Sequence, residues 1–221
     1  MKKTAIILGA TGLTGGLLLD QLINDNNYQN IKLFSRSKIE DLPSKVTQFI
    51  GDVLQLEQFK TDFTADQVFC CIGTTKAKTP DKELYKQIDY GIPVTAAKLA
   101  KANGIDTFLV ISALGANAKS KVFYNKTKGE MERDVLKQHI KNTFIFQPSL
   151  IGGNRKENRI LEAIGLAIFK VIQPLFFGKL KEYKITDPLK MVKAMINLAN
   201  RKNYAEVIIT SNEIKRITKN N

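Results

Sequence analysis

The sequence predicts an α/β protein with a Rossmann-type, doubly wound and mostly parallel sheet that carries helices on both faces. Short apolar runs of strand length alternate with longer helical patterns along the chain, and this alternation is typical of parallel sheets. The first apolar run, at residues 4–8, leads into a glycine-rich turn and then into an apolar run of helix formers. That order is typical of the first β–α unit of a doubly wound fold.

The expected elements follow one another in a regular order. Asp187 and Pro188 predict a helix start, with an N-cap aspartate and a proline in the first turn. Pro93 predicts a kink inside a long helix, and the polar tail at 212–221 is expected to fray. Strands are expected near residues 4–8, 31–35, 46–50, 67–72, 106–112, 143–147 and 205–210, and helices near 13–25, 53–60, 82–102, 124–138, 157–173 and 188–200.

Length and composition indicate one domain. The 221 residues are 43% hydrophobic, so we expect a single core and a single domain over residues 1–221. There is no run of about 18 uncharged apolar residues, and no integral membrane segment is expected. Cys70 and Cys71 are adjacent in an apolar run and indicate reduced, buried thiols in a cytoplasmic protein, with redox sensing as the alternative. With His139 as the one histidine, no metal site is expected.

The charge of the chain narrows the range of ligands. The net charge is +13 and the isoelectric point is about 9.6, which favours anionic ligands. The basic residues are scattered, without interleaved arginine and aromatic side chains, so no nucleic-acid partner is expected. Lys2 and Lys3 before an apolar stretch fit a secretory signal peptide. The regular glycines inside that stretch and the lack of a cleavage site argue against this interpretation.

The glycine-rich turn, GATGLTGG at 9–16, predicts a dinucleotide site. Gly9 allows a sharp turn, Gly12 leaves room for phosphate beside the backbone, and Gly15 allows close packing of the helix on the strand. The helix N-terminus then binds the pyrophosphate. The spacing is G-x-x-G-x-x-G, and such a turn also occurs without a nucleotide. The expected contacts of this turn are Gly9, Thr11, Gly12, Leu13, Thr14 and Gly15.

The residues after the second expected strand bear on the choice of cofactor. An NAD enzyme usually has an acidic residue there, which binds the ribose diol. This chain has Ser35 and Arg36 instead. An arginine suits a 2′-phosphate, so NADP(H) is favoured over NAD(H). The alternative is a surface arginine at a strand end.

Other strand ends supply further candidate cofactor contacts, because ligands bind at the carboxyl ends of the strands in such sheets. Asp52 and Val53 follow the third expected strand, and Asp52 is either an adenine contact or the N-cap of the next helix. After the fourth strand, small residues allow the backbone to pass close to a cofactor. They are Ile72, Gly73 and Thr74.

The candidate catalytic residues are Ser112, Tyr124 and Lys128. Ser112 ends the fifth expected strand, and Tyr124 and Lys128 form Y-x-x-x-K at the start of a helix, where residues four apart share a face. A nearby ammonium lowers the pKa of tyrosine, so Tyr124 can exchange a proton with a substrate oxygen that Ser112 also binds. Tyr28 and Lys32 match the same pattern. They lie at the start of a strand, and we interpret that match as coincidence.

These stretches together resemble the atypical short-chain dehydrogenase/reductase family, in its Tat-interacting-protein-30-like branch. The resemblance covers residues 4–200 and implies an NADP(H)-binding fold with Ser112, Tyr124 and Lys128 in the reductase triad. It also implies that Lys128 binds the nicotinamide ribose. Ala113 departs from relatives that have a second serine there. The stretches are GATGLTGG, LFSRS at 33–37, GD at 51–52, VFCCIGTTKAK at 68–78, ID at 88–89, VISALGA at 110–116, YNKTKGEME at 124–132 and FQPSLIGG at 146–153, and the implied nicotinamide side is Pro148, Ser149, Leu150 and Ile151.

The expected function is NADP(H)-dependent reduction of a small carbonyl or enone substrate by a single NAD(P)-binding domain. The alternative is a regulatory NADP(H)-binding protein with little turnover. Residues 154–186, apolar with a basic rim, are expected to form the substrate pocket or its lid. The apolar run at 160–178 also fits a homodimer face or a membrane-surface helix.

Overall fold

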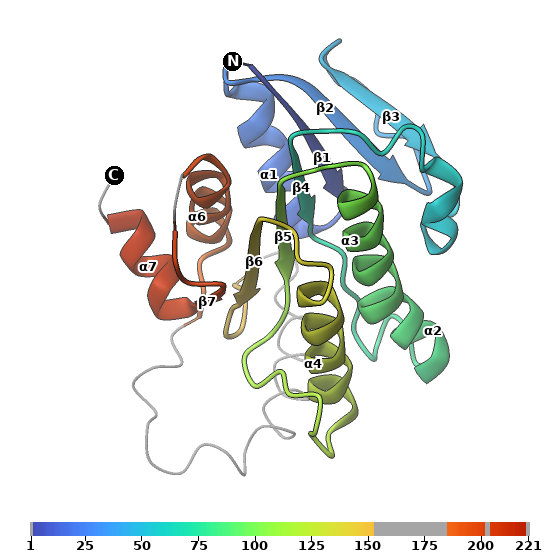
Figure 1. Ribbon diagram of the computed structural model, residues 1–221, viewed down its shortest axis with the longest axis vertical. Helices are drawn as coiled ribbons and strands as arrows, with labels where there is room; N and C mark the ends of the chain where they lie inside the picture. Colours follow the sequence, from blue (N-terminus) through green and yellow to red (C-terminus); the bar gives the residue numbers. More distant parts are fainter. Residues whose placement is uncertain (1, 153–184, 202–203, 220–221) are drawn as a thin grey trace.

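The computed structural model describes residues 2–152, 185–201 and 204–219 (Figure 1). Its centre is a seven-stranded sheet with the order β3-β2-β1-β4-β5-β6-β7, and every neighbouring pair is parallel. The order reverses at β1 and β4, which creates the crevice where doubly wound proteins bind ligands. The strands are β1 (Lys3–Leu8), β2 (Tyr28–Ser35), β3 (Val46–Ile50), β4 (Gln67–Cys70), β5 (Thr107–Ile111), β6 (Asn142–Gln147) and β7 (Ile208–Thr210).

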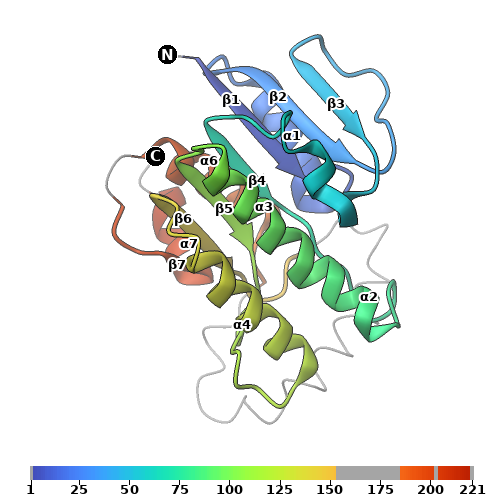
Figure 2. The same cartoon turned by 45° about the vertical axis from the view of Figure 1, so that its right-hand side comes forward.

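Helices cover both faces of the sheet, as predicted. One face carries α1, α6 and α7, and the other carries α3 and α4, which lie in front of the strands in Figure 2. The helical segments are α1 (Leu13–Asn24), η1 (Val53–Phe59), α2 (Lys82–Lys86), η2 (Gln87–Gly91), α3 (Ile92–Ala102), α4 (Phe123–Leu136), α6 (Pro188–Asn200) and α7 (Ser211–Lys219).

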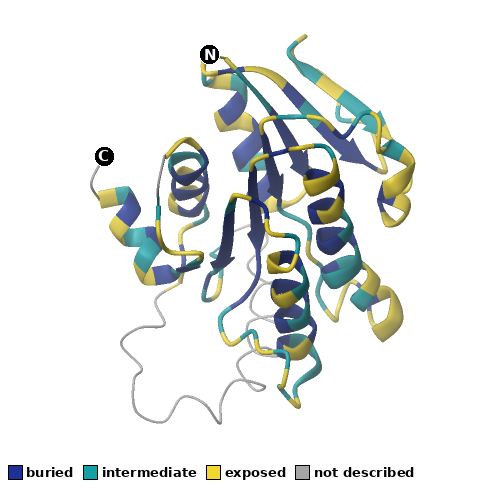
Figure 3. Ribbon diagram, in the orientation of Figure 1, coloured by how far each residue is buried: buried dark blue, intermediate teal, exposed yellow. Residues whose placement is uncertain are grey.

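The sheet divides the core into two layers. Alternate residues of a strand point to opposite faces. In β1, Ala5 and Ile7 therefore contact the layer under α1 and α6, whereas Ile6 and Leu8 contact the layer under α3. Figure 3 shows the central strands β4 and β5 buried, the edge strand β3 partly exposed, and exposed residues on the outer sides of the helices. A strand buried on both faces has to be almost continuously apolar, which explains why the β1 sequence is KTAIIL.

The expected helix at 82–102 is interrupted by a turn of π-helix. The segment runs as α2, then the π-helical η2, then α3, and Pro93 lies in the first turn of α3. The irregularity therefore precedes the proline. Pro93 has no N–H and cannot donate to the carbonyl of Asp89, four residues earlier, which favours a wider turn there. The expected helix at 53–60 is also irregular, since η1 is a 3-10 helix with non-helical backbone at Gln55.

The C-terminal part differs most from the prediction. The tail at 212–221 was expected to fray, but residues 211–219 form α7, whose Ile214 and Ile217 are buried against the layer that contains α6. Two apolar residues three positions apart give this short helix one buried side. The predicted start of α6 is confirmed, because Asp187 Oδ1 accepts hydrogen bonds from the backbone of Leu189 and Lys190. The expected helix at 157–173 lies outside the described residues.

Removal of the Ile217 side chain tests the docking of α7. Ile217→Ala removes a side chain that is 5% exposed, so we expect the free energy of unfolding to fall by about 2–3 kcal/mol. Lys219→Ala, on the exposed side of the same helix, should change it by less than about 0.5 kcal/mol. Urea unfolding of the two variants measures both values. Equal stabilities would mean that α7 contributes no packing.

Candidate active site

The turn between β1 and α1 has the geometry of a phosphate-binding loop. Gly9 has a φ of +86°, and its carbonyl accepts a hydrogen bond from the Gly12 N–H at 3.0 Å. A Cβ atom added to Gly15 would lie 2.0 Å from the Gly9 oxygen, so that glycine is required by close packing of the helix. At Gly12 an added Cβ would approach the protein no closer than 3.3 Å. That contact, with the Gly9 carbonyl oxygen, is tight, but Gly12 is otherwise exposed to the space in front of the turn.

The N-terminus of α1 faces that same space. No side chain caps this helix at Gly12, and its first turn has no acidic residue. Its first N–H groups and the positive end of the helix dipole suit an anionic group. This turn and the first turn of α1 form a glycine cradle that could hold a pyrophosphate, and its residues are the predicted contacts Gly9, Thr11, Gly12, Leu13, Thr14 and Gly15.

The ends of β2 and β3 lie at the same edge of the sheet, because β2 pairs with β1 in parallel. Arg36 is exposed there, and the Ser35 hydroxyl donates to the Ser37 carbonyl at 2.8 Å. Asp52 accepts a hydrogen bond from the Leu54 N–H at 3.0 Å as the N-cap of η1. The capping role considered for Asp52 is therefore present.

The backbone after β4 passes over a buried ion pair. Lys128 Nζ lies 2.6 Å from Asp89 Oδ1, and the side chains are 4% and 1% exposed. A Cβ added to Gly73 would lie 3.8 Å from Asp89 Oδ1 and 3.9 Å from Lys128 Nζ. The Thr74 N–H donates to the other carboxylate oxygen at 2.7 Å. Ile72, Gly73 and Thr74 thus lie beside the predicted catalytic lysine.

Lys128 makes a second contact at the end of β5. Its ammonium approaches the Ile111 carbonyl at 3.5 Å, and Ile111 directly precedes Ser112. Burial lowers the pKa of Lys128, but the negative charge of Asp89 more than offsets this and raises the pKa above its ordinary value. Lys128 therefore remains an ammonium at neutral pH.

The state of Tyr124 differs from the prediction. Burial raises the pKa of Tyr124 above its ordinary value. Lys128 acts to lower the pKa, as expected, but Asp89 acts in the same direction as burial. The net direction is upward because desolvation of the phenolate outweighs attraction to an ammonium that already has a carboxylate partner. Tyr124 is thus a protonated phenol at neutral pH.

Ser112 lies in a small polar cluster at the end of β5. It is 4% exposed, and its hydroxyl makes no direct hydrogen bond to any residue that the structure describes. The hydroxyl is nevertheless close enough to the Glu132 carboxylate to lower the pKa of that group. Gln147 Nε2 donates to both oxygens of Glu132, at 2.9 and 3.0 Å.

The segment after β6 is held at this edge from two sides. The Pro148 carbonyl accepts a hydrogen bond from the Leu114 N–H at 3.0 Å. Behind it, the hydroxyls of Ser149, Thr186 and Ser211 lie 2.8 to 3.2 Å from one another. Leu150 and Ile151 continue this segment, and Ile151 pairs with Thr186 in a parallel bridge. The expected pocket segment leaves and rejoins the described structure at that bridge, and its residues 154–184 lie outside the described residues.

Three residues of this cluster were missed as functional candidates. Asp89 pairs with Lys128, Glu132 lies next to Ser112, and Gln147 binds Glu132. Asp89 and Gln147 are distant from the triad in the sequence and approach it only in the folded chain. Glu132 follows Tyr124 and Lys128 at a spacing of four residues, so the face of one helix would have revealed it.

The second Y-x-x-x-K match is structural. Tyr28 and Lys32 lie in β2, far along the strand from its carboxyl end. The Tyr28 hydroxyl donates to the Gln67 side chain at 2.8 Å, and burial raises its pKa to about 12. Lys32 Nζ donates to the Asp62 carbonyl at 2.9 Å.

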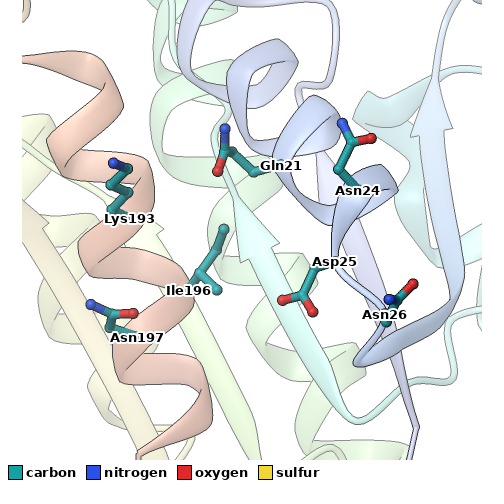
Figure 4. A pocket seen from close by; sticks show the side chains of 7 residues that line it. All are labelled: Gln21, Asn24, Asp25, Asn26, Lys193, Ile196 and Asn197. Carbon is teal, nitrogen blue, oxygen red and sulfur yellow. The ribbon is translucent and has the colours of Figure 1, made fainter. Parts of the chain in front are cut away.

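Other parts of the described structure lack features of a second site. A shallow polar groove between the end of α1 and α6 lies at the amino ends of the strands (Figure 4), and it is lined by residues such as Asn24, Asp25 and Lys193. Within the described ranges, no three acidic, histidine or cysteine side chains gather as metal ligands would. In the same ranges, no helix has the length and hydropathy needed to cross a bilayer.

The fold and the cradle define a dinucleotide-binding protein of the Rossmann type. A family model for NAD(P)H-binding proteins matches residues 9–161. Protein HTATIP2 of Rattus norvegicus is 32% identical over 88% of this chain and 80% of its own length. Protein FMP52 of Debaryomyces hansenii is 32% identical over 89% of this chain and 88% of its own length. The chain belongs to this NAD(P)H-binding family, among the atypical short-chain dehydrogenases/reductases, as its motifs predicted.

Solved structures support the fold. UDP-glucose 4-epimerase from Thermotoga maritima, in complex with UDP-glucose, has a TM-score of 0.70 at 17% identity, over 98% of this chain and 82% of that one. MoeE5 with UDP-glucose and NAD gives 0.69 at 15% identity, over 98% and 81%. At these identities the likeness shows a shared architecture.

The relatives contradict one prediction. A cytoplasmic location was expected, but several yeast FMP52 proteins of this family, including that of Debaryomyces hansenii, are named as mitochondrial. Cys70 and Cys71 are free thiols, and burial raises the pKa of each above its ordinary value. Cys70 is buried as expected, whereas Cys71 is half-buried, and free thiols of this kind do not identify a compartment.

Two glycine variants separate binding from folding. Gly12→Val should reduce NADPH affinity by at least about 100-fold, or about 2.7 kcal/mol, because its side chain fills the cradle. Its extended backbone, with φ −85° and ψ 168°, accepts valine, so the fold should remain. Gly15→Ala should instead destabilise the protein, because its Cβ would overlap the Gly9 carbonyl. Calorimetric titration and thermal unfolding measure the two effects. Wild-type NADPH affinity in Gly12→Val would show that the phosphates bind elsewhere.

Proposed function

We propose that this protein is an NADP(H)-dependent reductase of a small carbonyl or enone compound. The observation that carries the proposal is the buried Asp89–Lys128 ion pair next to Tyr124 and Ser112, at the edge of the sheet where the phosphate cradle also lies. A protein that only bound a dinucleotide would have no need of a proton donor at that point.

The protonation states favour reduction over dehydrogenation. The bound cofactor supplies the hydride in such a reaction. Tyr124, a phenol at neutral pH, donates its proton to the substrate oxygen. Ser112 donates a hydrogen bond to the same oxygen as negative charge develops on it. Dehydrogenation would require a phenolate, which burial and Asp89 both disfavour.

The contacts that we propose for the cofactor follow from the edge of the sheet. The glycine cradle and the first turn of α1 would bind the pyrophosphate, and Asp52 and Val53 would lie toward the adenine. The ribose that Lys128 binds would lie close to the backbone of Ile72, Gly73 and Thr74. Pro148, Ser149, Leu150 and Ile151 would line the nicotinamide side. We retain residues 154–186 as the proposed substrate-pocket segment because both flanks meet at this edge.

Arg36 is proposed to bind the 2′-phosphate. Arg36→Ala should weaken NADPH binding by about 1.5–3 kcal/mol, the scale of a charge-assisted hydrogen bond to phosphate, and should leave NADH binding unchanged. Lys38→Ala is the matched control, because Lys38 already pairs with Glu40 at 2.8 Å. Calorimetric titration of both cofactors against each variant measures this. Equal wild-type affinities for NADPH and NADH would contradict the assignment.

Tyr124→Phe tests the proton donor. Turnover in an NADPH-consumption assay on a panel of carbonyl compounds should fall by roughly 10²-fold or more, with NADPH affinity near that of the wild type. Lys128→Ala should reduce both, since it also leaves Asp89 buried without its partner. Tyr28→Phe, the matched tyrosine outside the site, should keep wild-type turnover. Undiminished activity in Tyr124→Phe would refute its catalytic role, and an inactive wild type would favour a regulatory protein.

A further inference from the structure

One buried acid on the catalytic face of α4 has no part in the mechanism above. Tyr124, Lys128 and Glu132 follow one another at intervals of four residues, so all three lie along one side of the helix. Glu132 is only 9% exposed. A buried carboxyl group in this position requires hydrogen-bond partners, and its partners are informative.

Glu132 lies between β6 and Ser112, the residue that follows β5. On one side Gln147 Nε2 donates to both carboxylate oxygens, at 2.9 and 3.0 Å. On the other side, the Ser112 N–H donates to the Phe146 carbonyl at 2.7 Å, which places Ser112 beside Gln147. The Ser112 hydroxyl is buried, is close enough to act on the Glu132 carboxylate, and makes no direct hydrogen bond within the described part of the chain. Gln147 therefore orients the carboxyl group of Glu132. The Ser112 hydroxyl has no hydrogen-bond acceptor among the described residues, so its proton can be donated to a ligand or to Glu132.

We propose that Glu132 is a titratable positioning residue that determines which way Ser112 directs its proton. A proton on Glu132 makes the acid a donor to Ser112 Oγ, and the Ser112 hydrogen is then available to the substrate oxygen. An ionised Glu132 can only accept, so it competes with the substrate for that hydrogen. This inference rests on the proposed reductase function and adds a second ionisation to it.

The protein environment stabilises the protonated form of Glu132 more than water does. Burial raises the pKa of Glu132, while Ser112, Gln147 and the Lys128 ammonium act to lower it, and the net direction is upward. Lys128 is the charged group acting on Glu132 from α4, and it is itself paired with Asp89 of η2. The β5 and β6 partners, Ser112 and Gln147, are neutral. Tyr124, with its raised pKa, loses its proton at higher pH than Glu132.

The sign of the pH dependence follows. Reduction should be fastest below the Glu132 pKa and should decline as the pH rises through it, before Tyr124 itself ionises. Glu132→Gln should remove that decline, because its amide donates permanently to Ser112 while its oxygen accepts from Gln147. We expect this variant to keep the low-pH rate of the wild type up to the pH at which Tyr124 begins to lose its proton. Glu132→Ala should lower kcat by at least about 10-fold, less than the roughly 10²-fold loss of an oxyanion donor.

The experiment measures kcat and KM against pH for the wild type and these two variants. Glu130→Gln is the matched control, because Glu130 lies on the same helix and pairs with Lys86 at 3.0 Å. That control should retain the wild-type profile, and the KM for NADPH should be unchanged in every variant. A Glu132→Gln enzyme that keeps the wild-type decline would overturn the proposal.

A second measurement does not depend on turnover. Carbon-13 labelling of glutamate side chains lets the titration of Glu132 be followed by NMR in the NADPH complex, with Glu132→Gln identifying its signal. Ser112→Ala should move the midpoint to higher pH, because the serine hydroxyl stabilises the ionised form. An unchanged midpoint would overturn the inference. A wild type that turns over no carbonyl compound would count against the reductase function alone.

Discussion

The buried ion pair between Asp89 and Lys128 is the interaction on which the candidate active site depends. Two ions removed from water need each other, and loss of either leaves a charge whose burial costs roughly 3–5 kcal/mol. The pair connects η2 to α4 at 2.6 Å, and the Thr74 N–H binds the same carboxylate. The helix with the tyrosine, the backbone after β4 and the end of β5 are thus held in one arrangement before any ligand binds. Such preorganisation is the main contribution that a protein makes to a reaction whose hydride comes from a cofactor.

The position of Asp89 has its origin in the backbone. A regular helix would run unbroken from Lys82 to Ala102, but the missing N–H of Pro93 removes a hydrogen bond to the carbonyl of Asp89. The resulting π-helical turn carries the buried aspartate toward α4. A turn of this kind in the middle of a helix is frequently associated with a functional site. The proline therefore influences the position of Asp89 through the backbone of η2.

The sequence predicted the sheet, and it identified candidate site residues at the strand ends, because both interpretations depend on local patterns. Strands that are apolar on both faces, the glycine turn and the Y-x-x-x-K spacing can all be recognised from short stretches of sequence. The state of Tyr124 was not, because its pKa depends on burial and on Asp89, which is distant in the sequence. The contact of Gln147 with Glu132 could not be predicted from the sequence for the same reason. In α7, a polar composition concealed Ile214 and Ile217, whose packing requires α6 to be present. Contacts between distant segments, rather than local propensity, set these features.

The bridge between Ile151 and Thr186 has a consequence for how this fold can diversify. The two backbones are joined there by hydrogen bonds in both directions, from Thr186 to Leu150 and from Gly152 to Thr186, and α6 begins directly afterwards. The chain segment between these points therefore starts and ends at the same bridge. The entropy of closing such a loop grows only slowly with its length. Exchange of this segment between homologues should therefore leave the sheet intact, so the substrate pocket that we propose there can vary while the cofactor-binding fold stays the same.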